Sequence, residues 1–341
     1  MAAREERRPP RKGRGGECPQ LLWLVAVEEL RTGGVVPSAA SASQPWRLDC
    51  EVNRKNIDKL IEEAWQIEQH EARKAGALGF MARSLAIATM PHRKVAGNEY
   101  KRTNGSFSLS MLAPSDVGLP FGSVPRLLMT WLTTDALRTK EREIVLGPSL
   151  SDFMRKMKIA PTGGEWGSIT RLRDQMERLF ACSIHGIWRD EKRSKISNFV
   201  VAEDADLWWD PKSPEEAALW RSTVLLGEKF FKEIVEHPVP IDLRAVQAIR
   251  RSPLAIDIYI WLTYRMSFLR EDMEISWPGL QLQFGAGYPM TPQGERNFRK
   301  AFRRELKKAL FVYQPDPPRV EDTSEYLLIR PSRTHIISAK S

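Results

Sequence analysis

A helix-forming stretch between Thr291 and Phe311 carries the densest group of side chains that could bind a ligand. Its apolar residues recur at helical spacing, and the rest of its surface is basic. The cations are Arg296, Arg299, Lys300, Arg303, Arg304, Lys307 and Lys308, and the acids among them are Glu295 and Glu305. Because these two acids cannot neutralise the seven cations, we expect the helix to bind an external polyanion.

Two other stretches carry basic side chains in a comparable setting. The stretch from Ser168 to Phe180 has an apolar face and an outward face with Arg171, Arg173 and Arg178. A polar turn that follows it carries Arg189, Lys192 and Arg193, which could contact phosphate without reading sequence. Two alternatives stay open, namely an ordinary surface helix whose acids pair with its arginines, and a solvated turn.

The elements that would position these side chains follow one another between Val124 and Ile184. A helix from Val124, a strand over 143–147, a helix that begins at Ser149, a glycine-rich turn over 158–167 and a helix from Ser168 are predicted. The alternating segments on either side of the basic turn at 189–194 predict a hairpin. This order is that of a winged helix, in which the third helix recognises DNA and the hairpin is the wing.

The same order recurs about 130 residues later. The matching anchors are Trp131 and Trp261, Glu143 and Glu274, Pro148 and Pro278, and Leu179 and Leu310, at offsets of 130 or 131 residues. A nearly constant offset predicts a duplicated domain. In the second copy we expect helices over 253–269, 279–284 and 291–311, a strand over 274–277, and a second wing formed by 312–313 and 326–329 around the loop 314–324.

The expected fold class is α+β and mainly helical, with tandem winged-helix domains. Residues 1–52 are expected to be a disordered basic tail. Residues 53–210 would hold an N-terminal helix over 53–75, a strand over 106–112 and the first winged helix, and residues 211–341 the second winged helix. The segment 225–239 is predicted to be a strand that crosses toward the second domain.

Composition narrows the class of partner without choosing it. The 341 residues carry a net charge of +9 with a pI near 9.5, which favours DNA, RNA or an anionic membrane surface. No apolar run reaches the roughly 20 residues that span a bilayer, and no signal-peptide core follows the basic N-terminus. We therefore expect a cytoplasmic protein. Three widely spaced cysteines predict neither disulfides nor a zinc site, and Cys182 is expected to be a core residue.

Catalytic patterns are missing from the sequence. A rolling-circle nickase needs a His-hydrophobic-His metal motif with a nucleophilic Tyr, but the five histidines stand singly at His70, His92, His185, His237 and His335. No glycine-rich phosphate loop ending in Gly-Lys-Ser or Gly-Lys-Thr occurs. We expect a protein that is not an enzyme and that needs no cofactor or metal.

A set of short motifs, densest between Gly79 and Ile184, resembles the RepA-type plasmid replication initiators. The motifs are Gly79-Phe80-Met81-Ala82-Arg83, Thr89-Met90-Pro91-His92, Asn104-Gly105-Ser106-Phe107, Leu119-Pro120-Phe121-Gly122, Pro125-Arg126-Leu127-Leu128, Leu146-Gly147-Pro148-Ser149-Leu150 and Pro161-Thr162-Gly163-Gly164. The resemblance implies two winged-helix domains that bind direct repeats in the double-stranded DNA of a plasmid origin. It also implies recruitment of host replication proteins and, often, repression of the initiator's own gene; whether the active form is a homodimer stays open.

Two alternatives to an initiator follow from the same residues. A transcriptional repressor without a replication role would bind one operator, and an origin-nicking enzyme would cleave DNA in the presence of a metal. In the initiator interpretation, Lys and Arg side chains supply most of the affinity through phosphates, and a few arginines read guanine edges. Arg299 and Arg303 are the residues whose replacement by Ala is expected to relax specificity if they read bases.

Overall fold

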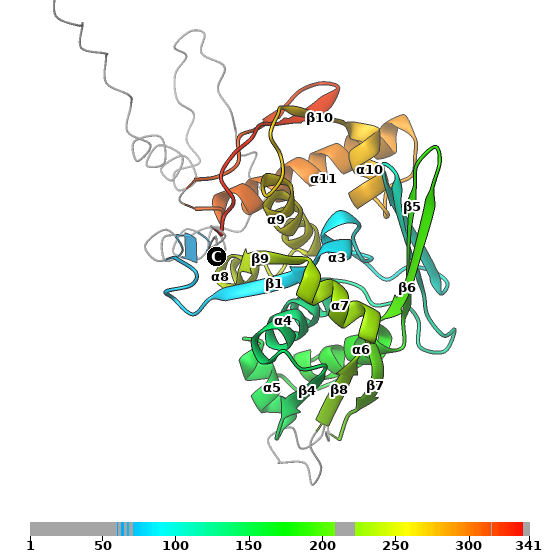
Figure 1. Cartoon of the computed structure of the whole chain (residues 1–341), viewed down its shortest axis with the longest axis vertical. Coiled ribbons are helices and arrows are strands. Elements are labelled where there is room, and N and C mark those ends of the chain that lie inside the picture. The colour runs from blue at the N-terminus through cyan, green and yellow to red at the C-terminus, as the bar shows by residue number, and fades with distance from the viewer. Residues whose placement is uncertain are drawn as a thin grey trace, which may run out of the picture. The chain divides into compact units, whose positions relative to one another are not determined.

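The computed structural model describes residues 60, 63–64, 67, 71–208, 222–314 and 316–336. Residues from Glu62 onward form one compact unit, and the description below concerns that unit. The predicted tail over 1–52 and most of the predicted helix over 53–75 lie outside the described residues. The described part is a mixture of helices and sheets rather than mainly helical (Figure 1).

The elements predicted between Val124 and Ile184 are confirmed. They are α4 (Ser123–Thr139), β4 (Glu143–Gly147), α5 (Leu150–Lys156) and α6 (Ser168–Phe180). Local chemistry explains their ends: Ser149 Oγ accepts a hydrogen bond from the backbone N–H of Asp152 at 3.2 Å and so caps α5. The cap residue after α4, Lys140, has φ 61°, the left-handed conformation that commonly ends a helix.

The predicted hairpin around 189–194 forms, but it is not the wing of this unit. It consists of β5 (Ser183–Arg189) and β6 (Ser194–Val200), and it joins β2 (Glu99–Asn104) and β3 (Phe107–Leu112), so the predicted strand over 106–112 is confirmed. The reason is cross-strand packing, since β5 pairs with β3 along its length and the ring of Phe107 lies 4.4 Å from that of Trp188.

The sheet of the first unit is completed by strands that the sequence did not reveal. β4 pairs with β8 (Ser222–Leu226), and β8 pairs with β7 (Ala202–Asp206). The predicted domain boundary between residues 210 and 211 therefore falls between two paired strands, and the first unit extends to Leu226.

The second copy has the same element order and the same strand order. It consists of α9 (Pro253–Met266), β10 (Met273–Ser276), α10 (Trp277–Phe284), α11 (Pro292–Phe311), β11 (Val320–Asp322) and β12 (Tyr326–Ile329). Its sheet order β10-β12-β11 matches the order β4-β8-β7 of the first unit. The strand expected at 312–313 is wrong, because Val312 caps α11 and Tyr313 stacks on His335 at 4.6 Å.

The strand expected over 225–239 is also wrong. That segment holds the end of β8, then α7 (Glu228–Glu236) and the start of β9 (Pro238–Asp242). Phe230 and Ile234, four residues apart, are buried on one side of α7, so the apolar pattern there is helical. β9 pairs with β1 (Leu78–Ala82), and the short helices α3 (Arg83–Ile87) and α8 (Leu243–Ala248) follow these two strands.

A buried ion pair joins the two units. Arg126 on α4 makes a bidentate contact with Asp257 on α9, through Nε to Oδ1 at 2.7 Å and Nη2 to Oδ2 at 2.6 Å. The guanidinium also donates to the carbonyl oxygens of Met90, Pro91 and Gly122.

His92 lies against the same carboxylate, with Nε2 at 2.7 Å from Oδ2 of Asp257. Burial alone would raise the pKa of Asp257, but Arg126 and His92 outweigh it and hold that pKa below its usual range. Burial lowers the pKa of His92. The network therefore holds a charged carboxylate in the interior and fixes α4 against α9.

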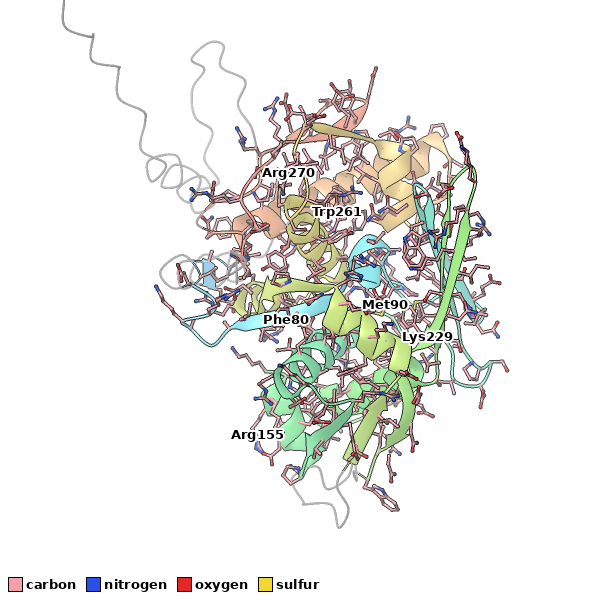
Figure 2. All side chains as sticks on the ribbon, in the orientation of Figure 1. Phe80, Met90, Arg155, Lys229, Trp261 and Arg270 are labelled. Carbon is pink, nitrogen blue, oxygen red and sulfur yellow. The ribbon has the colours of Figure 1, made fainter. Side chains whose placement is uncertain are left out.

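The core around these helices is apolar and aromatic. Trp261 and Met90, both labelled in Figure 2, are buried. The Trp261 ring lies 5.4 Å from that of Phe284, which in turn lies 5.4 Å from that of Phe302 on α11. These contacts hold α11 against α9 and α10 and leave its opposite side to solvent.

Candidate nucleic-acid interface

Helix α11 presents a basic stripe to solvent. Thr291 caps the helix by accepting a hydrogen bond from the backbone N–H of Gly294 at 3.1 Å, and Pro292 occupies the first turn. Three of the predicted cations, Arg296, Lys300 and Arg304, are exposed and follow one another at intervals of four residues. Residues at this spacing lie on the same helix face, so their charges form one continuous stripe. Arg304 also pairs with the neighbouring Glu305 at 2.8 Å, although its side chain is half exposed.

Arg299 and Arg303 are engaged inside the protein. Arg299 donates to the carbonyl oxygens of Thr323 and Ser324, and Arg303 Nη2 donates to Asp322 Oδ1 at 2.7 Å. Both guanidinium groups lie over the ring of Trp277, at 4.6 and 5.5 Å from its centroid. These two arginines clamp the β11–β12 hairpin to α11, a role that their positions in the sequence do not reveal. Lys307 is partly buried.

We expect Asp322→Asn to lower the free energy of unfolding by about 1–3 kcal/mol, because hydrogen bonds from two guanidinium groups lose their charged acceptor. Urea unfolding of the variant and the wild type measures this change. Glu321→Gln is the matched control, because Glu321 is an exposed residue of the same hairpin whose pair with Arg330 should contribute less than about 1 kcal/mol. Unchanged stability together with tighter DNA binding would instead assign Arg299 and Arg303 to DNA.

Helix α6 presents a smaller basic surface. Ile169, Leu172, Met176 and Leu179 are buried, as the apolar pattern predicts. Arg171 and Arg173 are exposed on the opposite side. Arg178 is drawn back toward the protein, with Nε 2.9 Å from Asp174 Oδ1 and its guanidinium over the ring of Phe121. Arg171 and Arg173 therefore remain as the cations of α6 that face solvent.

The β5–β6 turn exposes the third predicted group. Arg189, Lys192 and Arg193 are exposed, and Asp190 Oδ1 accepts hydrogen bonds from the backbone N–H groups of Lys192 and Arg193. That carboxylate closes the turn and fixes the backbone that carries the two cations. The turn belongs to the sheet β2-β3-β5-β6, so it is positioned by that sheet and not by α6.

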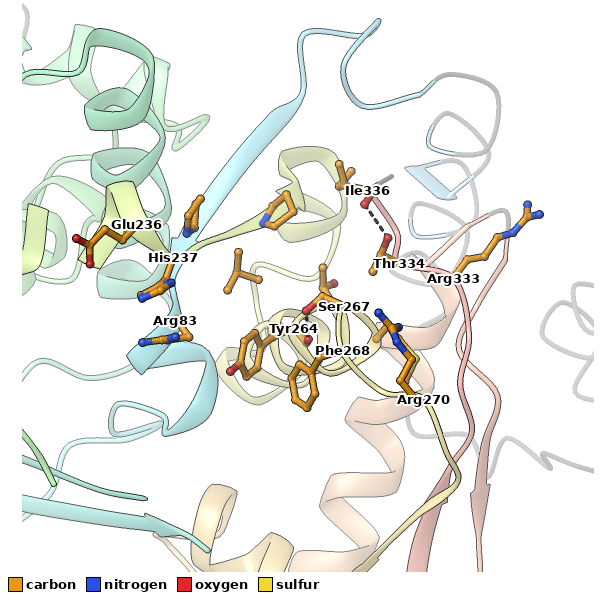
Figure 3. A pocket seen from close by; sticks show the side chains of 15 residues that line it. Arg83, Glu236, His237, Tyr264, Ser267, Phe268, Arg270, Arg333, Thr334 and Ile336 are labelled. Carbon is orange, nitrogen blue, oxygen red and sulfur yellow. Dashed lines mark hydrogen bonds between the residues drawn. The ribbon is translucent and has the colours of Figure 1, made fainter. Parts of the chain in front are cut away.

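A separate cavity of about 1050 Å³ lies between β9, the end of α9 and the segment near the C-terminus (Figure 3). Arg83, Arg270 and Arg333 line it together with Glu236, and Phe268 and its neighbour Tyr264 add aromatic rings 5.0 Å apart. Neither α6 nor α11 contributes a residue to this lining. The cavity is thus distinct from the basic faces of the two third helices.

Other candidate chemistry was tested on the same coordinates. Within the described ranges, no three or more His, Cys, Asp or Glu side chains come together in a way that could hold a metal ion. Cys182 is fully buried, and burial raises the pKa of its thiol to about 12, as suits a core residue. None of the helices in the described residues is long and apolar enough to cross a bilayer.

Comparison with known proteins gives one sequence match and two structural likenesses. A crystal structure of domains 2 and 3 of RctB, as selenomethionine derivatives, has a TM-score of 0.46 and 10% identity, and the match covers 74% of this chain and 96% of that one. A second structure of RctB domains 2–3 has a TM-score of 0.44 and 12% identity, covering 73% and 96%. No curated protein matches the chain. The family model described as "Plasmid encoded RepA protein" matches residues 119–278, which contain all of the first unit from α4 onward and the start of the second. The resemblance that the sequence motifs indicate is therefore confirmed, and this region belongs to the family of plasmid-encoded RepA proteins.

Proposed function

We propose that the protein initiates plasmid replication by binding repeated sequences in the double-stranded DNA of the plasmid origin. The observation that supports this most strongly is the repetition of one unit, with the same element order and strand order, whose third helix carries cations in solvent. Within the RepA family, two such units fit repeated DNA. The protein would act in the bacterial cytoplasm, recruit host replication proteins, repress its own gene and catalyse no reaction itself.

In this proposal each unit is a winged helix. α6 and α11 are the recognition helices, and the hairpins β7–β8 and β11–β12 are the wings. Each hairpin pairs with the strand that follows the first helix of its unit, as the wing of such a domain does. The β5–β6 turn is an additional phosphate contact outside the winged helix.

The contacts divide by position along each helix. Residues near the N-terminus of a recognition helix reach base edges, whereas later ones meet the backbone. Arg296 on α11 and Arg171 on α6 are therefore assigned to bases, and Lys300, Arg304 and Arg173 to phosphates. Arg299 and Arg303 support binding indirectly, by holding the wing against α11.

Fluorescence anisotropy with labelled DNA tests the proposal. We expect the purified protein to prefer DNA that flanks its own gene over a scrambled sequence at physiological salt, and to saturate tandem repeats in steps. Equal affinity for both DNAs that collapses as salt rises would contradict it, because that is the behaviour of nonspecific charge attraction.

The same preparations separate the two other candidate functions. A repressor without a replication role would bind a single operator and would not saturate in steps. A nickase would cleave supercoiled origin DNA in the presence of magnesium or manganese, so DNA that stays intact rejects that alternative.

A further inference from the structure

A large apolar side chain stands in solvent immediately before each third helix. Trp166 is 84% exposed and directly precedes Gly167, the N-cap residue of α6. Met290 is 61% exposed and directly precedes Thr291, the N-cap residue of α11. The two side chains thus occupy the same position in the two copies of the unit.

Packing within the protein does not explain this pair. An apolar residue just before an N-cap commonly packs on the fourth residue of the helix. That fourth residue is Arg171 in α6 and Glu295 in α11, so neither helix offers an apolar partner there. Exposed side chains of this size, at equivalent positions, point to a partner outside the chain.

The backbone beneath Trp166 is held in place. Thr162 and Ser168 hydrogen-bond each other reciprocally, with both backbone N–H groups donating to the other residue's hydroxyl at 2.9 Å. Thr170 Oγ1 donates to the carbonyl of Gly164 at 2.9 Å. A side chain at Gly167 would collide with the carbonyl oxygen of Thr162, so glycine allows the tight approach there. The loop is fixed while its indole is left outside.

The loop that carries Met290 is held by different residues with the same result. Gln281 Nε2 donates to the carbonyl oxygens of Tyr288 and Pro289, at 3.3 and 2.9 Å. The ring of Tyr288 lies 5.7 Å from that of Phe298 on α11. Two loops of unrelated sequence therefore each present one apolar side chain at the start of a recognition helix.

We infer that Trp166 and Met290 contact the methyl groups of thymines in the major groove of the origin repeats, an inference that rests on the proposed function. The start of a recognition helix is the part that reaches base edges. Thymine alone among the bases carries a methyl group in that groove, and apolar side chains recognise it. Each unit would then read one apolar feature beside the polar contacts of its arginines.

Replacement of thymine by deoxyuridine removes only that methyl group, and so provides the test. Each thymine of the repeat is replaced in turn, and binding is measured by anisotropy for the wild type, Trp166→Ala, Met290→Ala and the double variant. We expect the wild type to lose about fourfold in affinity at the contacted thymines, the change that one buried methyl group would give. Trp166→Ala should abolish the effect at one set of thymines and Met290→Ala at another.

Phe268→Ala is the matched control, since Phe268 is another exposed aromatic residue but lines the cavity away from α6 and α11. It should keep the full thymine preference. A double variant that discriminates thymine from deoxyuridine as the wild type does would overturn the inference and leave the proposed function intact. A wild-type protein with no preference for the repeats over scrambled DNA would overturn both.

Discussion

Replacement of Asp257 by alanine is expected to lower the free energy of unfolding by about 3–5 kcal/mol, a large share of the stability of an ordinary domain. The reason is the guanidinium of Arg126, which is 1% exposed and would lose both oxygens of its bidentate partner. His92 would lose its hydrogen-bond partner in the same step. Urea unfolding at neutral pH, followed by circular dichroism, measures the loss.

Two further variants separate the buried pair from the general effect of removing a carboxylate. Asp272→Ala removes an exposed acid, 57% accessible, that lies 3.4 Å from Arg330, and should change stability by less than about 1 kcal/mol. Arg126→Met combined with Asp257→Ala should destabilise by less than the two single changes added together, because no buried charge is left alone. A loss below about 1 kcal/mol for Asp257→Ala would show that the pair does not hold α4 against α9.

The second large effect is expected on DNA binding. Replacing Arg296, Lys300 and Arg304 together by alanine should weaken binding to the repeats about 100-fold or more, since each contact contributes about 1 kcal/mol or more. The slope of log affinity against log salt should also become shallower by about 2 to 3, because each lost phosphate contact releases one counterion fewer. Anisotropy titrations at several salt concentrations give both quantities.

The control for this triple variant keeps the change in net charge and moves it elsewhere. Lys74, Lys229 and Lys232 are exposed on other elements, the last two on α7. Their joint replacement by alanine should leave the affinity and the salt slope nearly unchanged. Equal weakening by both triple variants would mean that the overall charge of the protein, and not the stripe on α11, attracts DNA.

Sequence patterns located the helices because the signals for a helix are local. Ser149 before α5 and Thr291 before α11 cap their helices through a backbone amide three residues on, so residue type and spacing suffice to place both ends. The duplication was visible for the same reason, since the offset of about 130 residues joins elements that each have a local signature.

Strand partners were less accessible. β5 carries an alternating pattern that suits either sheet, and only the packing of Phe107 on Trp188 and the match of β5 to β3 decide its place. α7 was taken for a strand because its apolar residues are aromatic and β-branched, whereas burial of Phe230 and Ile234 against the core imposes a helix.

The basic side chains of the interface show the same division. Periodicity alone placed Arg296 and Lys300 outside the apolar face of α11, and they are exposed. It placed Arg299 and Arg303 outside that face too, but Asp322 lies 19 residues beyond Arg303 in sequence and binds it from another element. A partner brought by the tertiary fold cannot be found from spacing along one helix.

The pairing of β1 with β9, and of β8 with β4 and β7, has a consequence for synthesis of the chain on the ribosome. When residues up to 210 have been made, neither β8 nor β9 exists, so the backbone groups of β1, β4 and β7 await partners. The first half of the protein therefore completes its folding only after the first strands of the second half emerge. Until then its unpaired strand edges are open to other nascent chains, and a fragment that ends near residue 210 is expected to aggregate.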